Sequence, residues 1–237
     1  VRGSGYPGFW ENINDDDEAS LALWLDAMHI KASGNDGLTT GDALTHWMDL
    51  SNKQHHVTQS TSNKQPEYSV DSVRAYVDFD GSDNMRATFT GITIPQKTLY
   101  MVVEVQNQGD NQWLSLDNNT SETDDGGVKV WLGSGNNGQN NNVDMGYIEP
   151  GQTKSVLSNA KIVSGVAIYK AVFDTDKIEL FVNGTSVGTQ SGIVLNTKSL
   201  VDVVVGSSAW GAGFLDGKVA EILVLSDVLD SQKSIEL

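Results

Sequence analysis

The sequence alternates short strand-like segments with loops rich in glycine, asparagine and aspartate, and this alternation constrains the fold more than any other feature. In residues 21–25 leucine occupies every second position, and in residues 73–79 valine, alanine, valine and phenylalanine do the same. This period of two is typical of a strand with one buried face. Apart from residues 228–237, no segment keeps the 3.6-residue period of a helix, so the sequence predicts an all-β protein.

Other segments predict further strands and the turns between them. Asn183-Gly184 is a strong hairpin signal, because both central residues of a type I′ turn need positive φ. Residues 200–206 and 219–225 are continuous apolar runs, as expected for central strands of a sandwich. We therefore predict an antiparallel β-sandwich or jelly roll, with residues 228–237 as a short C-terminal helix. The remaining predicted strands are 44–50, 99–105, 113–116, 128–132, 162–173, 177–182 and 186–190.

The length of 237 residues suits a single sandwich domain, and no change of composition along the chain marks a second one. Residues 1–18 are different in character, because they are rich in glycine and asparagine and end in an acidic run. A run of this kind stays solvated. We expect residues 1–18 to form an arm or linker and residues 19–237 to form the domain. Because the chain begins with Val1 rather than methionine, we also expect a processed product or an excised domain.

The charge and the missing cysteines exclude several classes of function. Asp and Glu total 31 against 15 Lys and Arg, a net charge of −16. Such a surface repels phosphate backbones and anionic lipids, so we expect no nucleic-acid partner. No apolar run approaches the roughly 18 residues of a membrane span, so we expect no membrane insertion. Without cysteine the chain has no disulfides, no thiol chemistry and no cysteine-ligated zinc.

Five segments, taken in order, match a known superfamily. They are 23–27 (Leu-Trp-Leu-Asp-Ala), 47–52 (Trp-Met-Asp-Leu-Ser-Asn), 77–83 (Val-Asp-Phe-Asp-Gly-Ser-Asp), 173–184, and 214–224 (Phe-Leu-Asp-Gly-Lys-Val-Ala-Glu-Ile-Leu-Val). Together they resemble the concanavalin A-like lectin/glucanase superfamily, in particular the laminin-G-like domains of bacteria and viruses. The resemblance spans about residues 21–237 and implies a concanavalin A-like jelly roll. It specifies function much less, because this fold carries lectins, glycosidases, lyases and adhesion modules.

The sequence favours binding over catalysis. Retaining glycosidases of this superfamily carry paired carboxylates on one strand. The nearest imitation here is Asp174, Asp176 and Glu179, but the resemblance places the first two in a turn between strands. Residues 54–56 (Gln-His-His) and 169–171 (Tyr-Lys-Ala) faintly resemble alginate lyase motifs, yet they fall at the wrong places in the strand order. We therefore assign no catalytic residue.

Aromatic residues beside polar loops are the candidates for sugar binding, because lectin-like sandwiches stack indole or phenol rings on pyranose faces. These candidates are Trp210, Trp113, Trp131 and Tyr147. Trp210 is the most suggestive, since it lies in a loop of small residues (206–213) where a large ring has few neighbours. The alternative for Trp210 is a loop anchor packed on the sandwich. For Trp113 and Trp131, which fall in strands, the alternative is packing in the core or on a sheet face.

The resemblance also implies calcium as a candidate cofactor, held by oxygen ligands in loops at the rim. Residues 117–125 form the densest oxygen cluster, and Asp117, Asp124 and Asp125 are the candidate ligands. The cluster lacks the glycine and the final glutamate of an EF-hand, so only a looser site is predicted. Asp80 and Asp83, at the mouth of a loop, are a second candidate pair. For Asp83 the alternative is that it caps its own turn.

These observations predict a non-catalytic carbohydrate-binding or adhesion module, extracellular, at a cell or virion surface, with a glycan or polysaccharide as ligand. Two alternatives stay open. The first is a structural virion or assembly domain, such as a phage or viral fibre or decoration protein, that binds protein subunits of a larger surface assembly. The second is a polysaccharide-degrading enzyme, either a glycosidase or a lyase.

Overall fold

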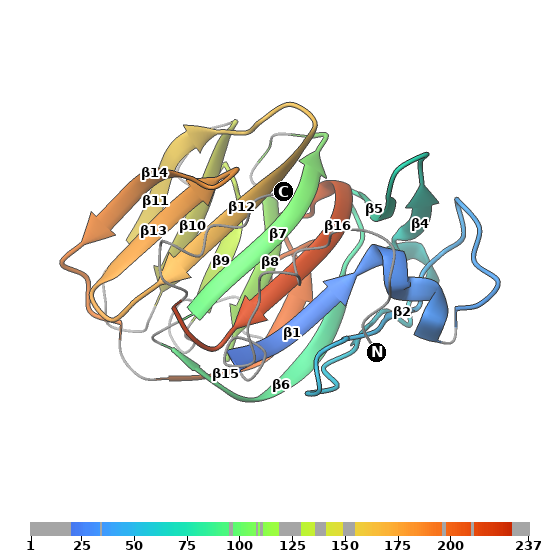
Figure 1. Cartoon of the computed structure of the whole chain (residues 1–237), viewed down its shortest axis with the longest axis horizontal. Helices are drawn as coiled ribbons and strands as arrows, with labels where there is room; N and C mark the ends of the chain where they lie inside the picture. Colours follow the sequence, from blue (N-terminus) through green and yellow to red (C-terminus); the bar gives the residue numbers. More distant parts are fainter. Residues whose placement is uncertain are drawn as a thin grey trace.

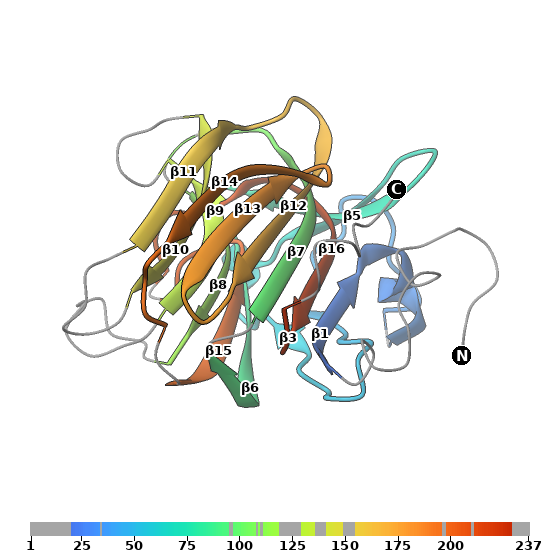
Figure 2. The ribbon, with the colours of Figure 1, turned by 60° about the vertical axis from the view of Figure 1, so that its left-hand side comes forward.

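The computed structural model describes residues 20–33, 35–94, 97–107, 109, 111–118, 129–135, 141–148, 155–195, 198–209 and 211–228. The expected arm (1–18) and most of the expected C-terminal helix therefore lie outside the described residues. Two antiparallel sheets pack face to face, as Figures 1 and 2 show. This confirms the predicted antiparallel β-sandwich.

The front sheet in Figure 1 has eight strands, in the order β14-β13-β12-β7-β16-β5-β4, with β1 pairing β16 beside them. The long strand β16 thus pairs β7 along one side, and β5 and then β1 along the other. The strands are β1 (Leu21–Asp26), β4 (Glu67–Val70), β5 (Ala75–Asp80), β7 (Lys97–Val105), β12 (Val166–Phe173), β13 (Lys177–Val182), β14 (Thr185–Ser191) and β16 (Asp216–Leu225).

The back sheet also has eight strands, in the order β11-β10-β9-β8-β15-β6-β3-β2. They are β2 (His46–Trp47), β3 (Val57–Thr58), β6 (Met85–Ile94), β8 (Asn111–Asp117), β9 (Lys129–Ser134), β10 (Asn142–Ile148), β11 (Ser155–Lys161) and β15 (Lys198–Val205). Two short 3-10 helices, η2 (Ala27–Ser33) and η3 (Ser62–Lys64), complete the described structure. None of the helices in these residues is long and apolar enough to cross a membrane.

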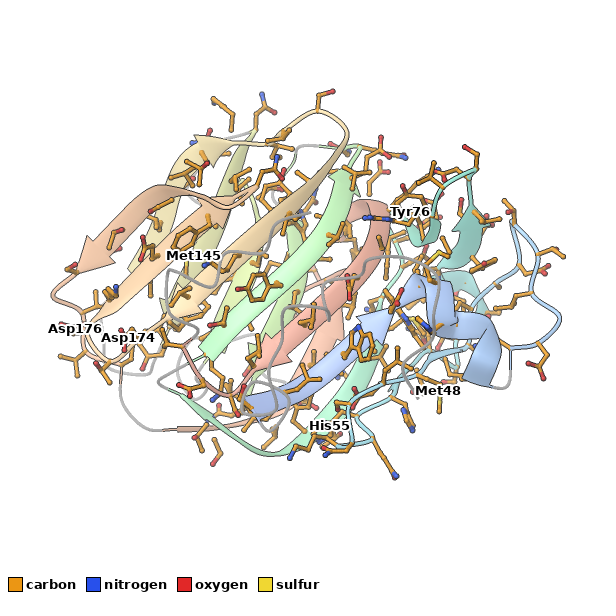
Figure 3. The ribbon with its side chains drawn as sticks, in the orientation of Figure 1. Met48, His55, Tyr76, Met145, Asp174 and Asp176 are labelled. Atoms are coloured by element: carbon orange, nitrogen blue, oxygen red, sulfur yellow. The ribbon has the colours of Figure 1, made fainter. Side chains whose placement is uncertain are left out.

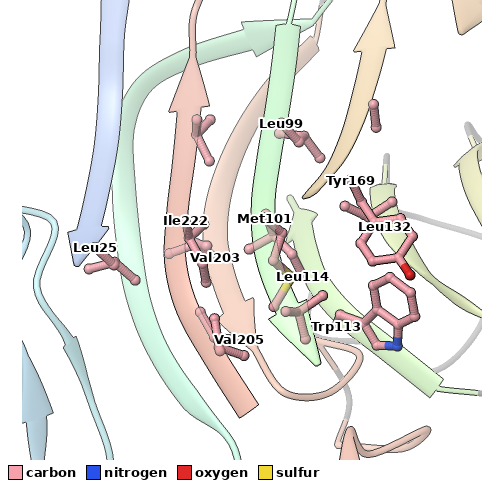
Figure 4. Close-up of a cluster of buried hydrophobic side chains, with 14 of the residues drawn as sticks. Leu25, Leu99, Met101, Trp113, Leu114, Leu132, Tyr169, Val203, Val205 and Ile222 are labelled. Atoms are coloured by element: carbon pink, nitrogen blue, oxygen red, sulfur yellow. The ribbon is translucent and has the colours of Figure 1, made fainter. Parts of the chain in front are cut away.

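The core lies between the sheets and follows the alternation seen in the sequence. Leu23 and Leu25 of β1 are fully buried in it. Trp113 of β8 and Tyr169 of β12 meet edge to face across the sandwich, with ring centroids 5.0 Å apart, and Figure 4 shows them among the other buried side chains. Aromatic pairs in this geometry add stability beyond the area that they bury. The contact between Trp113 and Tyr169 therefore joins the back sheet to the front sheet.

The local predictions are confirmed at the hairpin and corrected elsewhere. Asn183 and Gly184 have φ values of 47° and 78°, and the turn connects β13 to β14 as predicted. The expected strand 44–50 shrinks to β2. The expected strand 162–173 is shorter at its start, because Gly165 takes a φ of 80° and β12 begins only at the next residue.

Candidate functional site

The predicted sugar-binding aromatics lie in three kinds of place. Trp113 and Tyr147 belong to the core, with 0% and 2% of their surface exposed. Their rings fill the space between the sheets, which corrects the expectation that they face a sugar. Trp131 points away from the core but is only 1% exposed. Trp210 lies outside the described residues.

Trp131 lies flat on the outward face of the back sheet. A Cβ atom added at Gly146, its neighbour on β10, would be 2.1 Å from the indole, so the ring covers that glycine. The Lys129 ammonium is 5.2 Å from the ring centroid. Asp117, one of the predicted calcium ligands, lies directly opposite Lys129 on the neighbouring strand and is 2% exposed. The structure thus brings Trp131 and Asp117 to one sheet face, but that face is buried.

An open site lies elsewhere, in a hollow of about 290 Å³ at one end of the sandwich. We call it the rim cavity. It forms where β4, β5 and the start of β16 meet the segment that follows β7. Its rim is exposed at Glu67, Asp80 and Gln106, and its base is buried at Phe79 and Asp83. The lining residues are Gln65, Glu67, Asp78, Phe79, Asp80, Asp83, Gln106 and Asp216.

The strand register gathers the carboxylates of the rim cavity. Glu67 on β4 lies opposite Asp78 on β5, and Asp80 lies opposite Asp216 on β16. Asp78 has a cationic partner, because the Lys218 ammonium is 3.6 Å from its carboxylate. Burial raises the pKa of Asp78, and the lysine opposes that effect. Like charges placed directly opposite each other destabilise a sheet, so this arrangement is not explained by fold stability.

Asp80 and Asp83, the second predicted metal pair, both cap the turn between β5 and β6. The Ser82 backbone N–H and hydroxyl donate to Asp80 Oδ1 at 2.9 and 2.7 Å, and these bonds hold the pKa of Asp80 below its usual range. The Asp80 N–H donates to Asp83 Oδ2 at 3.1 Å. Burial raises the pKa of Asp83 to about 6, and the charges of Asp80 and Glu67 add to this shift.

The loop that follows β15 lies beside this turn. The Gly81 N–H donates to the Leu215 carbonyl at 2.9 Å, and the Asn84 side-chain amide donates to the Ser207 hydroxyl at 3.1 Å. A Cβ atom at Gly206 would be 2.5 Å from the Phe79 ring, so loop and turn are in close contact. Two features singled out separately in the sequence, loop 206–213 and the pair Asp80–Asp83, therefore meet at one rim.

Calcium binding stays a prediction. In the part of the chain that the structure describes, no three His, Cys, Asp or Glu side chains are arranged to hold a metal ion. Asp124 and Asp125 lie outside that part. The capping bonds at Asp80 and Asp83 already occupy one oxygen of each carboxylate.

The residues that imitate catalytic motifs are not among those that line the rim cavity. Asp174 and Asp176 lie in the β12–β13 turn at the outer edge of the sandwich (Figure 3). Glu179 accepts a hydrogen bond from the Ser186 hydroxyl at 2.7 Å. His55, of the stretch 54–56, is buried, with 7% of its surface exposed. Its Nδ1 is 2.9 Å from the Ala22 carbonyl, and its ring packs on Phe89.

No protein-family model and no curated protein sequence matches the chain. Solved structures do match its fold. Domain 4 of AbnA, a GH43 extracellular arabinanase from Geobacillus stearothermophilus, in complex with arabinotriose, superposes with a TM-score of 0.65. The match has 11% identity and covers 91% of this chain and 97% of that chain.

Binding domains of botulinum neurotoxins are also similar. One, from type DC in complex with rat synaptotagmin II, has a TM-score of 0.57 at 9% identity over 91% of this chain and 50% of that chain. A structure of botulinum neurotoxin type C, whose cell entry is dependent upon interaction with two ganglioside molecules, is similar as well. It has a TM-score of 0.57 at 8% identity, over 92% of this chain and 50% of that chain. At such identities these matches show a shared β-sandwich fold.

Proposed function

We propose that this chain is a non-catalytic carbohydrate-binding module that works outside the cell, at a cell or virion surface, and that it binds glycan in the rim cavity. The observation that supports this most is the open hollow of about 290 Å³ lined by carboxylates and side-chain amides. Its volume is at the small end of ligand pockets, which suits one sugar unit of a longer chain.

The chemistry of the lining fits sugar hydroxyls. A carboxylate accepts hydrogen bonds only, and hydrogen bonds to an ionised acceptor are stronger than neutral ones. Asp80 and Asp216 supply such acceptors, while Gln65 and Gln106 supply both donors and acceptors. A sugar hydroxyl can donate a hydrogen bond to the carboxylates, and it can both donate to and accept from the glutamine amides. The negative field disfavours acidic sugars, so the expected ligands are neutral glycans.

The similar folds add support of a general kind. The arabinanase domain was solved with arabinotriose, and the type C neurotoxin interacts with gangliosides. This fold therefore serves glycan binding in other proteins. Gly206 and Ser207, at the start of loop 206–213, contact Phe79 and Asn84 beside the cavity. Trp210 of the same loop is the residue we expect to stack on the sugar.

The test is a glycan array probed with the full chain, once with calcium and once with chelator. We expect binding to neutral glycans, no binding to sialylated or uronate glycans, and no release of reducing ends. Loss of binding in chelator would support the calcium prediction. If no glycan on the array binds and the chain self-associates, the proposal is contradicted and a structural assembly domain is favoured. Release of sugar would favour an enzyme.

A further inference from the structure

Two carboxylates lie opposite each other on the outward side of the front sheet. They are far apart in the sequence, so only the pairing of their strands reveals them as a pair. Asp26 ends β1, and Glu221 lies directly opposite it on β16. Leu25 and Ile222, the adjacent residues, point into the core, so both acids point outward. Side chains directly opposite in an antiparallel pair have Cβ atoms about 5 Å apart, where like charges repel.

The partners of the two acids differ. Asp26 has both oxygens occupied, because Oδ1 accepts from the Met28 N–H at 2.8 Å and Oδ2 is 2.5 Å from His29 Nδ1. Glu221 Oε1 accepts from the Trp24 indole N–H at 3.0 Å. The Asp26 carboxylate is therefore held by two partners on its own segment, whereas the Glu221 carboxyl is held by a neutral donor.

The groups that face Glu221 come from several elements. β1 contributes Asp26 and Trp24, η2 contributes His29 next to Asp26, and the turn before β5 contributes the cation Arg74. On β5, Tyr76 belongs to the apolar cluster that packs with Trp24 on this face, and on β7 the opposite residue is Val102.

Glu221 consequently binds its proton tightly. Burial raises its pKa from the ordinary value of 4.5 to about 7, and Asp26 adds to that shift, while the Trp24 hydrogen bond and Arg74 act against it. A carboxyl whose folded pKa is raised holds more protons in the folded state than in the unfolded state. Its contribution to stability is therefore present below pH 4.5, declines as the pH rises to about 7, and is fully lost above that.

We propose that a single proton on Glu221, opposite Asp26, controls how firmly strand β1 is attached to β16, which makes this junction a pH-sensitive element near neutrality. With the proton present, one neutral and one ionised carboxyl face each other. Without it, two negative charges oppose each other beside the half-buried Trp24. β1 also carries the core residues Leu23 and Leu25, so weaker attachment of β1 weakens the packing of the core. The proposal does not depend on glycan binding.

The test is urea unfolding of the full chain between pH 5 and pH 8, with Glu221→Gln and the control Glu104→Gln. Glutamine keeps a carbonyl that accepts from Trp24 but has no proton to lose. Glu104 lies on the same sheet face opposite Lys218 rather than opposite an acid. From pH 5 to pH 8, we expect the unfolding constant of the native chain to rise roughly 100-fold relative to that of Glu221→Gln. Glu104→Gln should follow the native chain. An equal pH response of native chain and Glu221→Gln would overturn the proposal.

A second measurement needs no stability change in a variant. The Trp24 indole N–H resonance, assigned by its loss in Trp24→Phe, reports the charge of its acceptor. We expect this resonance in the native chain to shift with pH with a midpoint near 7 and to stay constant in Glu221→Gln. A midpoint below about pH 5.5 in the native chain would show that Glu221 is an ordinary carboxylate and would overturn the proposal.

Discussion

Asp80 and Asp216 lie directly opposite each other where β5 pairs with β16, at the mouth of the rim cavity. They come from opposite halves of the chain. Two opposed negative charges do not stabilise a sheet. They can, however, accept hydrogen bonds from a ligand rich in hydroxyl groups. This relationship underlies the proposal that the cavity binds sugar.

Replacing Asp216 with asparagine should raise stability and lower affinity together. Removal of the repulsion should stabilise the fold by about 0.5 kcal/mol, while loss of a charged acceptor should weaken glycan binding about tenfold. Thermal unfolding and calorimetric titration measure the two effects. Asp176→Asn, in the distant β12–β13 turn, is the control and should change neither. Unchanged affinity in Asp216→Asn would place the ligand elsewhere.

Glycan binding should weaken as the pH falls from 7.5 to 5. Asp83 at the base of the cavity has its pKa raised to about 6, so it becomes a neutral acid over this interval and loses its charged acceptor. The same protonation stabilises the fold, because the folded pKa lies above the ordinary 3.8 and stability therefore falls as the pH rises from about 4 to 6. Affinity measured across this range should be flatter in Asp83→Asn. A native chain whose affinity is constant with pH would speak against Asp83 as a binding group.

Gly206→Ala should destabilise the protein far more than Gly211→Ala, although both glycines have positive φ, 87° and 77°. Strain of the backbone costs about 1 kcal/mol at either position. At Gly206 the new Cβ would also be 2.5 Å from the Phe79 ring and 3.0 Å from the Asp83 carbonyl, whereas at Gly211 nothing lies within 4 Å. We expect a loss of about 3 kcal/mol at Gly206 in urea unfolding. Equal effects would mean that loop and turn are not in contact.

Trp113→Phe should cost stability and leave glycan affinity unchanged. The indole is fully buried between the sheets against Tyr169, and trimming a buried side chain costs roughly 1–3 kcal/mol. Unfolding and titration on the same preparation check both statements. Loss of affinity without loss of stability would show that Trp113 meets ligand after all.

The fold could be predicted because its signals are local. Alternate leucines mark β1, and Asn183-Gly184 needs a hairpin wherever the flanking strands lie. β6, β10 and β11 were missed because their sequences are interrupted by glycine, asparagine, serine and threonine, which resemble loop composition. A polar strand is recognised only once its partner strand is known.

The candidate site was predicted in part, for a related reason. Asp80 and Asp83 stood out as neighbours in the chain, but Glu67, Asp78 and Asp216 reach the same cavity through strand register between distant segments. Trp113 and Tyr147 could not be separated from surface aromatics by sequence, because both faces of β8 and β10 are buried and the apolar period of two is hidden.

The most direct test of the rim cavity as a glycan site is an NMR titration of the isotope-labelled full chain with a neutral glycan selected on the array. We expect the largest shift changes in the backbone amides of residues 78–84, 106–107 and 211–217, with none at the β12–β13 turn. Saturable binding that leaves these amides unmoved and shifts others, such as those of β9 and β10 around Trp131, would contradict the assignment of the site.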